Sequence, residues 1–206
     1  MAIFRFRQRY EQSTGAIGEI CVRLGLTADI LTLAGGLFSI FAAYFLATGK
    51  SLWGVAMCGL VGIADVLDGA TARARGTCTR FGAMLDRIVD RYTEFIILTG
   101  ILLGEQASPV WVMFAVSGMI MASYVRSTAE SVGGLKTCTV GWVGRLEKLV
   151  LIVAGVVLQL FVPHISFVKY ALIIVGGLSH ATAVQRVLYA RRIILSSTNG
   201  GEETNG

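Results

Sequence analysis

Cysteine is scarce in this sequence, and its four cysteines are widely spaced. No CxxC pair occurs, so the chain lacks the spacing that is typical of zinc sites and of small disulfide frameworks. Free thiols, either buried or facing the cytosol, are therefore expected. The cysteines are Cys21, Cys58, Cys78 and Cys138.

The N-terminal segment lacks the unbroken apolar core of a cleavable signal peptide. Arginines and glutamates are spread through it, which predicts a basic amphipathic helix over residues 1–25 that lies on the membrane surface. A solvated tail is the alternative. At the other end, SSTNGGEETNG is polar and glycine-rich, which predicts a disordered tail over residues 193–206.

Apolar residues and glycine are abundant: 54% of the chain is hydrophobic and 25 residues are glycine. A soluble domain of this length needs less apolar surface, and glycine allows close helix packing in lipid. We therefore expect an all-α integral membrane protein with six transmembrane helices in one domain, residues 26–192. Segments of ~20 mostly apolar residues can span a bilayer. They cover residues 27–48, 52–75, 81–103, 109–130, 143–162 and 165–190.

Basic residues are distributed unevenly between the two sides of this predicted topology. If the N-terminus is cytoplasmic, all of the 18 lysines and arginines except Lys50 and Lys169 fall on the cytoplasmic side. The positive-inside rule therefore predicts a multi-pass protein of the cell (cytoplasmic) membrane, with both termini cytoplasmic. The polar residues of the second, third, fifth and sixth spans also lie toward the cytoplasmic ends, which predicts a polar cavity, and with it the active site, open to the cytoplasm. The outer halves of the spans are nearly free of charge, which argues against a pore through the bilayer.

Four aspartates stand in the stretch DVLDGATARARGTCTRFGAMLDRIVD. They fall within the second and third predicted membrane spans, where burying a charge is costly. Asp65 and Asp68 are spaced i, i+3 and Asp86 and Asp90 are spaced i, i+4, so each pair shares one helix face. Converging carboxylates repel one another unless cations neutralise them. Oxygen ligands suit the hard divalent cations Mg²⁺, Mn²⁺ or Ca²⁺, and two such ions form a clamp for displacement at phosphorus. One carboxylate could then act as a general base.

Small residues and an arginine accompany the aspartates. Gly69 and Gly82 let a phosphate or a nucleotide approach the backbone, and Arg73 can bind a phosphate oxygen. Two other interpretations remain: ion pairs between the aspartates and nearby arginines, and a cation channel or transporter that uses the same carboxylates. The charge-free outer halves of the spans argue against the channel.

The stretch resembles the signature of the CDP-alcohol phosphotransferase family, D-x2-D-G-x2-A-R-x8-G-x3-D-x3-D, at every fixed position. The resemblance implies transfer of a phosphatidyl-type group from a CDP-linked donor to an alcohol, with release of CMP. It also implies that the aspartates hold two divalent ions and that Asp90 is the catalytic base. The implied metal ligands are Asp65, Asp68, Asp86 and Asp90. The implied CDP-binding residues are Asp65, Asp68, Gly69, Ala72, Arg73 and Gly82.

The segment before the first span departs from the family pattern. Many members carry a Pro-Asn pair there, whereas this chain has Ala28 and Asp29. No role of that asparagine is therefore carried over. Asp29 precedes an apolar run and is expected to cap the first helix.

The acceptor has to be inferred from outside the signature. SYVRSTAESVGGLKTCTVGWVGRLEKLVLI resembles the phosphatidylinositol-phosphate and archaetidylinositol-phosphate synthases, which implies inositol 1-phosphate as acceptor and diacylglycerol or archaeol in the donor. Such a dianion suits a basic pocket. The candidates are Arg126, Lys136, Arg145, Arg186 and Arg191. Lipid headgroups could engage the same cations. Glycerol 3-phosphate, as in phosphatidylglycerophosphate synthases, is the second choice of acceptor and serine the third.

Further partners are expected from the same resemblance. Gly100 and Gly104 form a GxxxG motif, and Gly118 with Ala122 continues a face of small residues. The resemblance also implies a homodimer, because members of the family commonly form one. Together with these motifs, it predicts a dimer through the third and fourth spans. A bilayer and a CDP-lipid are the other expected partners, and nucleic acid is not one. His180 is expected to be a core residue rather than a catalytic one.

Overall fold

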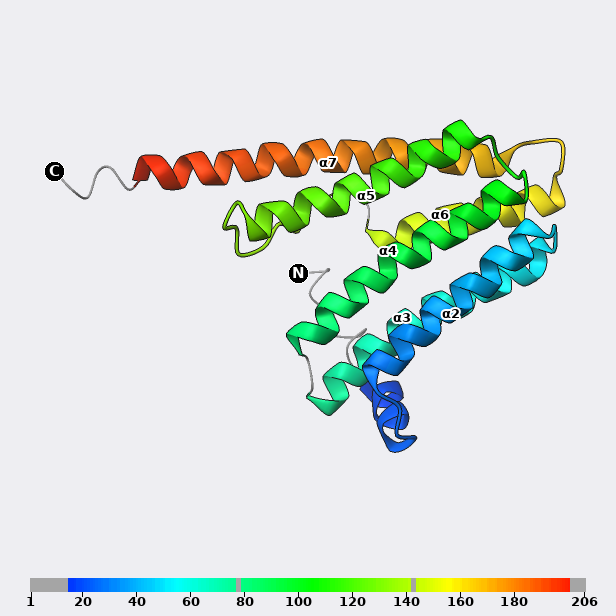
Figure 1. Ribbon diagram of the computed structural model, residues 1–206, viewed down its shortest axis with the longest axis horizontal. Helices are drawn as coiled ribbons and strands as arrows, with labels where there is room; N and C mark the ends of the chain where they lie inside the picture. Colours follow the sequence, from blue (N-terminus) through cyan, green and yellow to red (C-terminus); the bar gives the residue numbers. More distant parts are fainter. Residues whose placement is uncertain (1–14, 77–78, 142–143, 201–206) are drawn as a thin grey trace. The chain divides into compact units, whose positions relative to one another are not determined.

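The computed structural model describes residues 15–76, 79–141 and 144–200, with side chains up to residue 196. These residues form helices and connecting loops, without a β-strand among them. They divide between Gly104 and Glu105 into two compact units. The helices are α2 (Ala28–Ala47), α3 (Ser51–Arg75), α4 (Arg80–Leu103), α5 (Pro109–Ser131), α6 (Arg145–Phe161) and α7 (Phe167–Gly200) (Figure 1).

The helices fall close to the six predicted segments, but they differ as membrane spans. Four of them, α2, α3, α5 and residues 167–196 of α7, are long and apolar enough to cross a membrane by length and composition. The first half of α4 carries the charged residues of the aspartate signature, and α6 has 17 residues. The all-helical class is confirmed.

Close helix packing in the first unit depends on glycines. α2 packs against both α3 and α4. A Cβ atom at Gly100 of α4 would meet the backbone of Ala43 in α2, and one at Gly104 would meet the carbonyl oxygen of Leu46. The GxxxG motif of α4, predicted to face a second subunit, is therefore filled by α2 of the same chain.

Replacing Gly100 by alanine is expected to destabilise the first unit. The added methyl group would overlap backbone atoms of Ala43, which cannot move aside as a flexible side chain could. Overpacking of this kind costs about 1–3 kcal/mol, so the midpoint of thermal unfolding in detergent should fall. Gly59→Ala is the control, because a Cβ atom there meets nothing within 4 Å. Equal midpoints for the two variants would contradict this packing.

The second unit is built on α7, which packs against α5 and α6. A Cβ atom at Gly118 of α5 would lie 2.9 Å from the ring of His180 in α7. That ring stacks on Phe114 with a centroid separation of 4.9 Å. The small-residue face of α5 is thus also occupied within the chain, and His180 has the structural environment that the sequence predicts.

The lead-in segment is helical over residues 15–23, and the basic residues before it lie outside the described residues. This helix rests on α3, because a Cβ atom at Gly18 would lie 2.5 Å from the carbonyl oxygen of Ala70. Ile17, Ile20 and Leu24 are exposed, whereas Cys21 is buried. The described part therefore has one apolar face toward the exterior and one against the protein.

Two end assignments from the sequence need correction. The side chain of Thr27, not that of Asp29, caps α2, because its hydroxyl accepts a hydrogen bond from the amide of Ile30 at 3.2 Å. At the C-terminus, α7 continues to Gly200, so the predicted tail cannot be disordered from residue 193. The apolar residues Ile193, Ile194 and Leu195 extend the helix beyond the last arginine.

Cysteines behave as the spacing predicts. Cys21, Cys58 and Cys138 are free and buried. Cys78 lies outside the described residues.

Candidate active site

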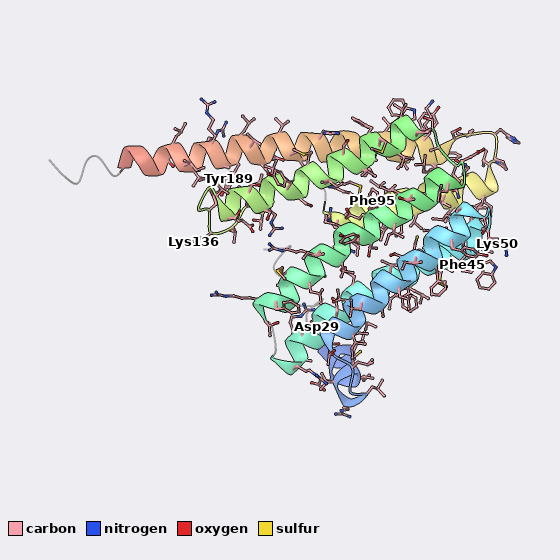
Figure 2. The ribbon with its side chains drawn as sticks, viewed as in Figure 1. Asp29, Phe45, Lys50, Phe95, Lys136 and Tyr189 are labelled. Atoms are coloured by element: carbon pink, nitrogen blue, oxygen red, sulfur yellow. The ribbon has the colours of Figure 1, made fainter. Side chains whose placement is uncertain are left out.

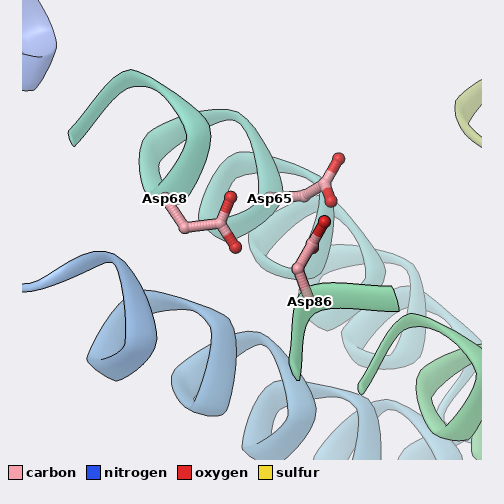
Figure 3. A group of neighbouring side chains, drawn as sticks. All are labelled: Asp65, Asp68 and Asp86. Carbon is pink, nitrogen blue, oxygen red and sulfur yellow. The ribbon is translucent and has the colours of Figure 1, made fainter. Parts of the chain in front are cut away.

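Three of the four signature aspartates converge in the first unit. Asp65 and Asp68 come from α3 and Asp86 from α4, and one carboxylate oxygen of each lies within 4.8 Å of the others. Figure 3 shows Asp86 pointing from α4 toward the two aspartates of α3. Asp68 is buried and the other two are half-buried. The described part of α3 and α4 thus holds a compact carboxylate cluster.

Signals in the sequence that end α3 and begin α4 prepare this convergence. α3 ends at Arg75 and is capped by Gly76, whose φ of 64° is left-handed and suits glycine. α4 begins after Thr79, whose hydroxyl accepts a hydrogen bond from the amide of Gly82 at 2.9 Å. Asp68 stands about two turns before the end of α3, and Asp86 about two turns after the start of α4. Because few residues connect the two helices, Asp68 and Asp86 lie at similar heights along α3 and α4.

The cluster has the chemistry of a divalent-cation site. Carboxylate oxygens in such proximity are strongly repulsive without a counter-charge, and oxygen donors are the ligands preferred by Mg²⁺ and Mn²⁺. The three residues present fit such an ion. A hydroxyl also supports the cluster, since Thr32 of α2 donates a hydrogen bond to Asp68 Oδ2 at 2.7 Å.

Asp90 lies outside this three-residue group, one turn further along α4 than Asp86. Its side chain is half-buried and has a polar partner of its own. The prediction that Asp90 is a fourth metal ligand and the catalytic base therefore stays a prediction.

The two glycines of the signature lie close to charged side chains, which a larger residue would contact. A Cβ atom at Gly69 would lie 3.2 Å from the guanidinium of Arg73. At Gly82 it would lie 3.4 Å from an oxygen of Asp29, which Figure 2 shows at the start of α2. Ala72 is half-buried on α3. Sequence reasoning missed the proximity of Asp29 to the signature, although its place in the unusual Ala-Asp pair was the available signal.

The predicted acceptor residues all belong to the second unit, where two of them have structural partners. Arg126 pairs with Glu130 at 3.0 Å on α5. Arg186 of α7 donates to the carbonyl oxygens of Val140 and Ala122, at 2.7 and 2.5 Å. Arg186 therefore links α7 to α5 and to the loop that follows α5, whereas the ion pair of Arg126 lies within α5.

The loop between α5 and α6 is fixed by the same groups. Glu130 accepts a hydrogen bond from the amide of Cys138 at 3.1 Å. Leu135 and Cys138 pack with Ala129 and Ala190 in a small buried cluster. The loop is thereby attached to α5 and to α7. Glu130, which sequence reasoning treated only as a marker of a subgroup, is a central residue of this attachment.

Three other predicted acceptor residues lie in this loop, at the start of α6 and on α7. Lys136 is exposed within the loop (Figure 2), and Arg191 is exposed on α7. Arg145 is the first residue of α6 and is half-buried. The second unit thus exposes Lys136 on the anchored part of the loop and Arg191 on α7.

Comparison with known proteins identifies the family. A sequence model of the CDP-alcohol phosphatidyltransferase family matches residues 25–185. The archaetidylinositol phosphate synthase of Methanothermobacter thermautotrophicus is 38% identical over 173 residues, which cover 84% of this chain and 87% of that protein. The phosphatidylinositol phosphate synthase of Mycobacteroides abscessus is 33% identical over 158 residues, covering 73% and 71% of the two chains.

Solved structures agree with the sequence relatives. The phosphatidylinositol phosphate synthase of Mycobacterium tuberculosis with CDP-DAG bound has a TM-score of 0.75 and 28% identity, covering 86% of this chain and 92% of that chain. A second structure of that enzyme, in complex with manganese and citrate, has the same TM-score and covers 88% of that chain.

This chain belongs to the CDP-alcohol phosphatidyltransferase family, as its aspartate signature predicts. It is therefore a transferase whose relatives include inositol-phosphate lipid synthases of archaea and bacteria.

Proposed function

We propose that this protein joins inositol 1-phosphate to a CDP-activated lipid and releases CMP. The convergence of Asp65, Asp68 and Asp86 supports the reaction class. The acceptor is supported by similarity to the archaetidylinositol and phosphatidylinositol phosphate synthases. The donor is a CDP-linked diacylglycerol or archaeol, and the product is an inositol-phosphate lipid of phospholipid biosynthesis.

The roles of the residues follow from the chemistry of the donor. Two divalent ions, held by Asp65, Asp68 and Asp86 with Asp90 beside them, would neutralise the diphosphate and polarise the phosphorus under attack. Arg73, over Gly69, would bind a phosphate oxygen. Asp90 would accept the proton of the acceptor hydroxyl while its oxygen attacks the lipid-linked phosphorus. The bond to the CMP oxygen then breaks, and CMP leaves.

The acceptor phosphate would be bound by the basic residues of the second unit. Lys136 sits on a loop anchored by Glu130 and Arg186, which limits the conformations available to its backbone. Pre-ordering of this kind lowers the entropic cost of binding. The proposed phosphate-binding residues are Arg126, Lys136, Arg145, Arg186 and Arg191.

In the membrane, we assign six spans, with α4 and α6 joining the four long apolar helices. α4 has 24 residues, about 36 Å at 1.5 Å per residue, which is enough for a ~30 Å core. The charged first half of α4 would lie at the inner interface. Figure 2 supports this orientation, because Lys50 and Asp29 lie at opposite ends of the hairpin formed by α2 and α3. Both termini are then cytoplasmic, and the lead-in helix over residues 15–23 lies on the inner surface.

A homodimer remains part of the proposal on the basis of the family resemblance. Its interface would use surfaces other than the Gly100 and Gly118 faces, since these pack inside the chain. Mass measurement of the protein in detergent or nanodiscs tests the assembly.

An acceptor panel tests the proposed function. Purified protein with Mg²⁺ or Mn²⁺ would be incubated with CDP-diacylglycerol or CDP-archaeol and with inositol 1-phosphate, glycerol 3-phosphate, serine or free inositol. CMP release is expected with inositol 1-phosphate. Release with glycerol 3-phosphate alone would transfer the assignment to the phosphatidylglycerophosphate synthase type. Absence of release with every pair, together with ion flux in proteoliposomes, would favour the cation transporter.

A further inference from the structure

A buried hydroxyl from α2 contacts the carboxylate cluster of α3 and α4. Thr32 is 7% exposed, Asp68 is also 7% exposed, and the hydroxyl of Thr32 donates to Asp68 Oδ2 at 2.7 Å. We propose that Thr32 is a positioning residue that fixes the carboxylate of Asp68 in the orientation needed for a divalent cation. The inference rests on the proposed metal-binding role of Asp65, Asp68 and Asp86.

The hydroxyl group of Thr32 donates its proton to Asp68 rather than to the backbone of its own helix. Threonine has a single O–H donor, and two acceptors are within reach: Asp68 Oδ2 at 2.7 Å and the carbonyl oxygen of Ala28 at 3.1 Å. Hydrogen bonds to a carboxylate are shorter and about twice as strong as bonds between neutral groups. The shorter, charge-assisted bond therefore takes the proton, and the carbonyl of Ala28 keeps only a secondary contact.

Close packing of α2 on α3 brings the two groups together. Gly35 stands one turn after Thr32, and Ala64 stands one turn before Asp68. A Cβ atom at Gly35 would lie 3.4 Å from the Cβ of Ala64, so the helices approach closely there. A short side chain such as threonine can then span the remaining gap to Asp68.

Other buried hydroxyls of these two helices bond differently. The hydroxyl of Thr71 donates to the carbonyl of Leu67 in its own helix at 2.7 Å. The hydroxyl of Ser39 donates to the carbonyl of Gly36, also in its own helix, at 2.6 Å. Thr32 instead bonds across helices to a carboxylate, which a purely helical role does not require. Thr71, buried and three residues from Asp68, is therefore a matched control.

Removal of the hydroxyl should act on metal affinity. Thr32 donates to one oxygen of Asp68, which restricts rotation of the carboxylate. The other oxygen would then be kept in a fixed direction for a cation. Hydrogen-bond partners of metal-ligating groups typically contribute about 10- to 100-fold in metal affinity or activity. Thr32→Val keeps the shape of the side chain but deletes the donor, so it isolates this contribution.

The test measures Mn²⁺ binding directly, on the full-length protein in detergent and without substrates. Electron paramagnetic resonance of free Mn²⁺ gives the affinity, and thermal unfolding verifies that each variant is folded. Thr32→Val is expected to weaken Mn²⁺ binding about 10- to 100-fold. Thr32→Ser, which keeps the hydroxyl, should restore affinity close to that of the original protein. Thr71→Val should leave the Mn²⁺ affinity unchanged. In a separate assay of CMP release, the KM of Thr32→Val for the acceptor should equal that of the original protein.

Several results would overturn the role of Thr32. These are undiminished Mn²⁺ affinity in a folded Thr32→Val protein, lack of rescue by serine, and an equal loss in Thr71→Val. If Thr32→Val does not fold, Thr32→Ala provides the same comparison with serine. A protein that binds Mn²⁺ in this way but releases no CMP with inositol 1-phosphate would refute the proposed acceptor alone. A protein that binds no Mn²⁺ would refute the role of Thr32, and the proposed function would fail with it only if CMP release were absent with both Mg²⁺ and Mn²⁺.

Discussion

Asparagine in place of Asp86 is expected to reduce CMP release by on the order of a thousandfold or more. Asp86 is the member of the carboxylate cluster that α4 contributes, so its loss separates that helix from the shared cation site. Cation chemistry at phosphorus contributes several kcal/mol, and each ~1.4 kcal/mol is a factor of ten in rate. The measurement is the initial rate of CMP release at saturating CDP-lipid and inositol 1-phosphate, over a titration of Mn²⁺.

Glu105→Gln provides the control for Asp86→Asn. Glu105 is an exposed carboxylate in the turn after α4, outside the cluster. Its neutralisation should leave both the rate and the Mn²⁺ dependence unchanged. An Asp86→Asn protein that keeps its rate at the same Mn²⁺ concentration would show that the cluster does not hold the catalytic ions.

Asparagine in place of Asp90 is expected to lower kcat by about 10²- to 10⁴-fold, the usual contribution of a general base. The affinity for CDP-lipid should change little, because the three converging carboxylates remain intact. Asparagine has nearly the same shape as aspartate but cannot accept the proton of the acceptor hydroxyl. CMP release gives kcat, and equilibrium binding of CDP-lipid in the presence of Mn²⁺ gives the affinity.

The Asp90 variant also distinguishes the two roles that the signature resemblance implies. Loss of CDP-lipid binding and of Mn²⁺ affinity, together with kcat, would assign Asp90 mainly as a metal ligand. An unchanged kcat would remove it from the chemistry. Thr32→Val provides a useful contrast, since it is expected to weaken Mn²⁺ binding while leaving Asp90 in place.

The metal cluster could be predicted from the sequence because its geometry is local. Spacings of three and four residues place Asp65 with Asp68 and Asp86 with Asp90 on shared helix faces. Gly76 directly after α3 and the capping Thr79 directly before α4 then end one helix and begin the next within a few residues. Each of these features is encoded within a few residues, so the proximity of Asp65, Asp68 and Asp86 could be expected, whereas the position of Asp90 outside that group could not.

Contacts between distant segments could not be predicted in this way. Thr32 and Asp68 are 36 residues apart, and nothing in the residues around Thr32 marks its partner. The glycines of α4 show the related problem of ambiguous packing. A small-residue face at Gly100 fits a neighbouring helix of the same chain as well as one of a second subunit, and only the folded structure distinguishes them.

The contact between Gly18 and Ala70 restricts how the sequence can vary among related proteins. A side chain at position 18 would meet the main-chain oxygen of Ala70 rather than its methyl group. No replacement at position 70 can therefore create room, and a larger residue at position 18 would have to push away the helix that carries Asp65 and Asp68. A surface helix would ordinarily tolerate genetic drift. Position 18 is an exception, because a larger residue there would displace the helix that carries two residues of the carboxylate cluster. Homologues with the same packing should therefore retain glycine at this position.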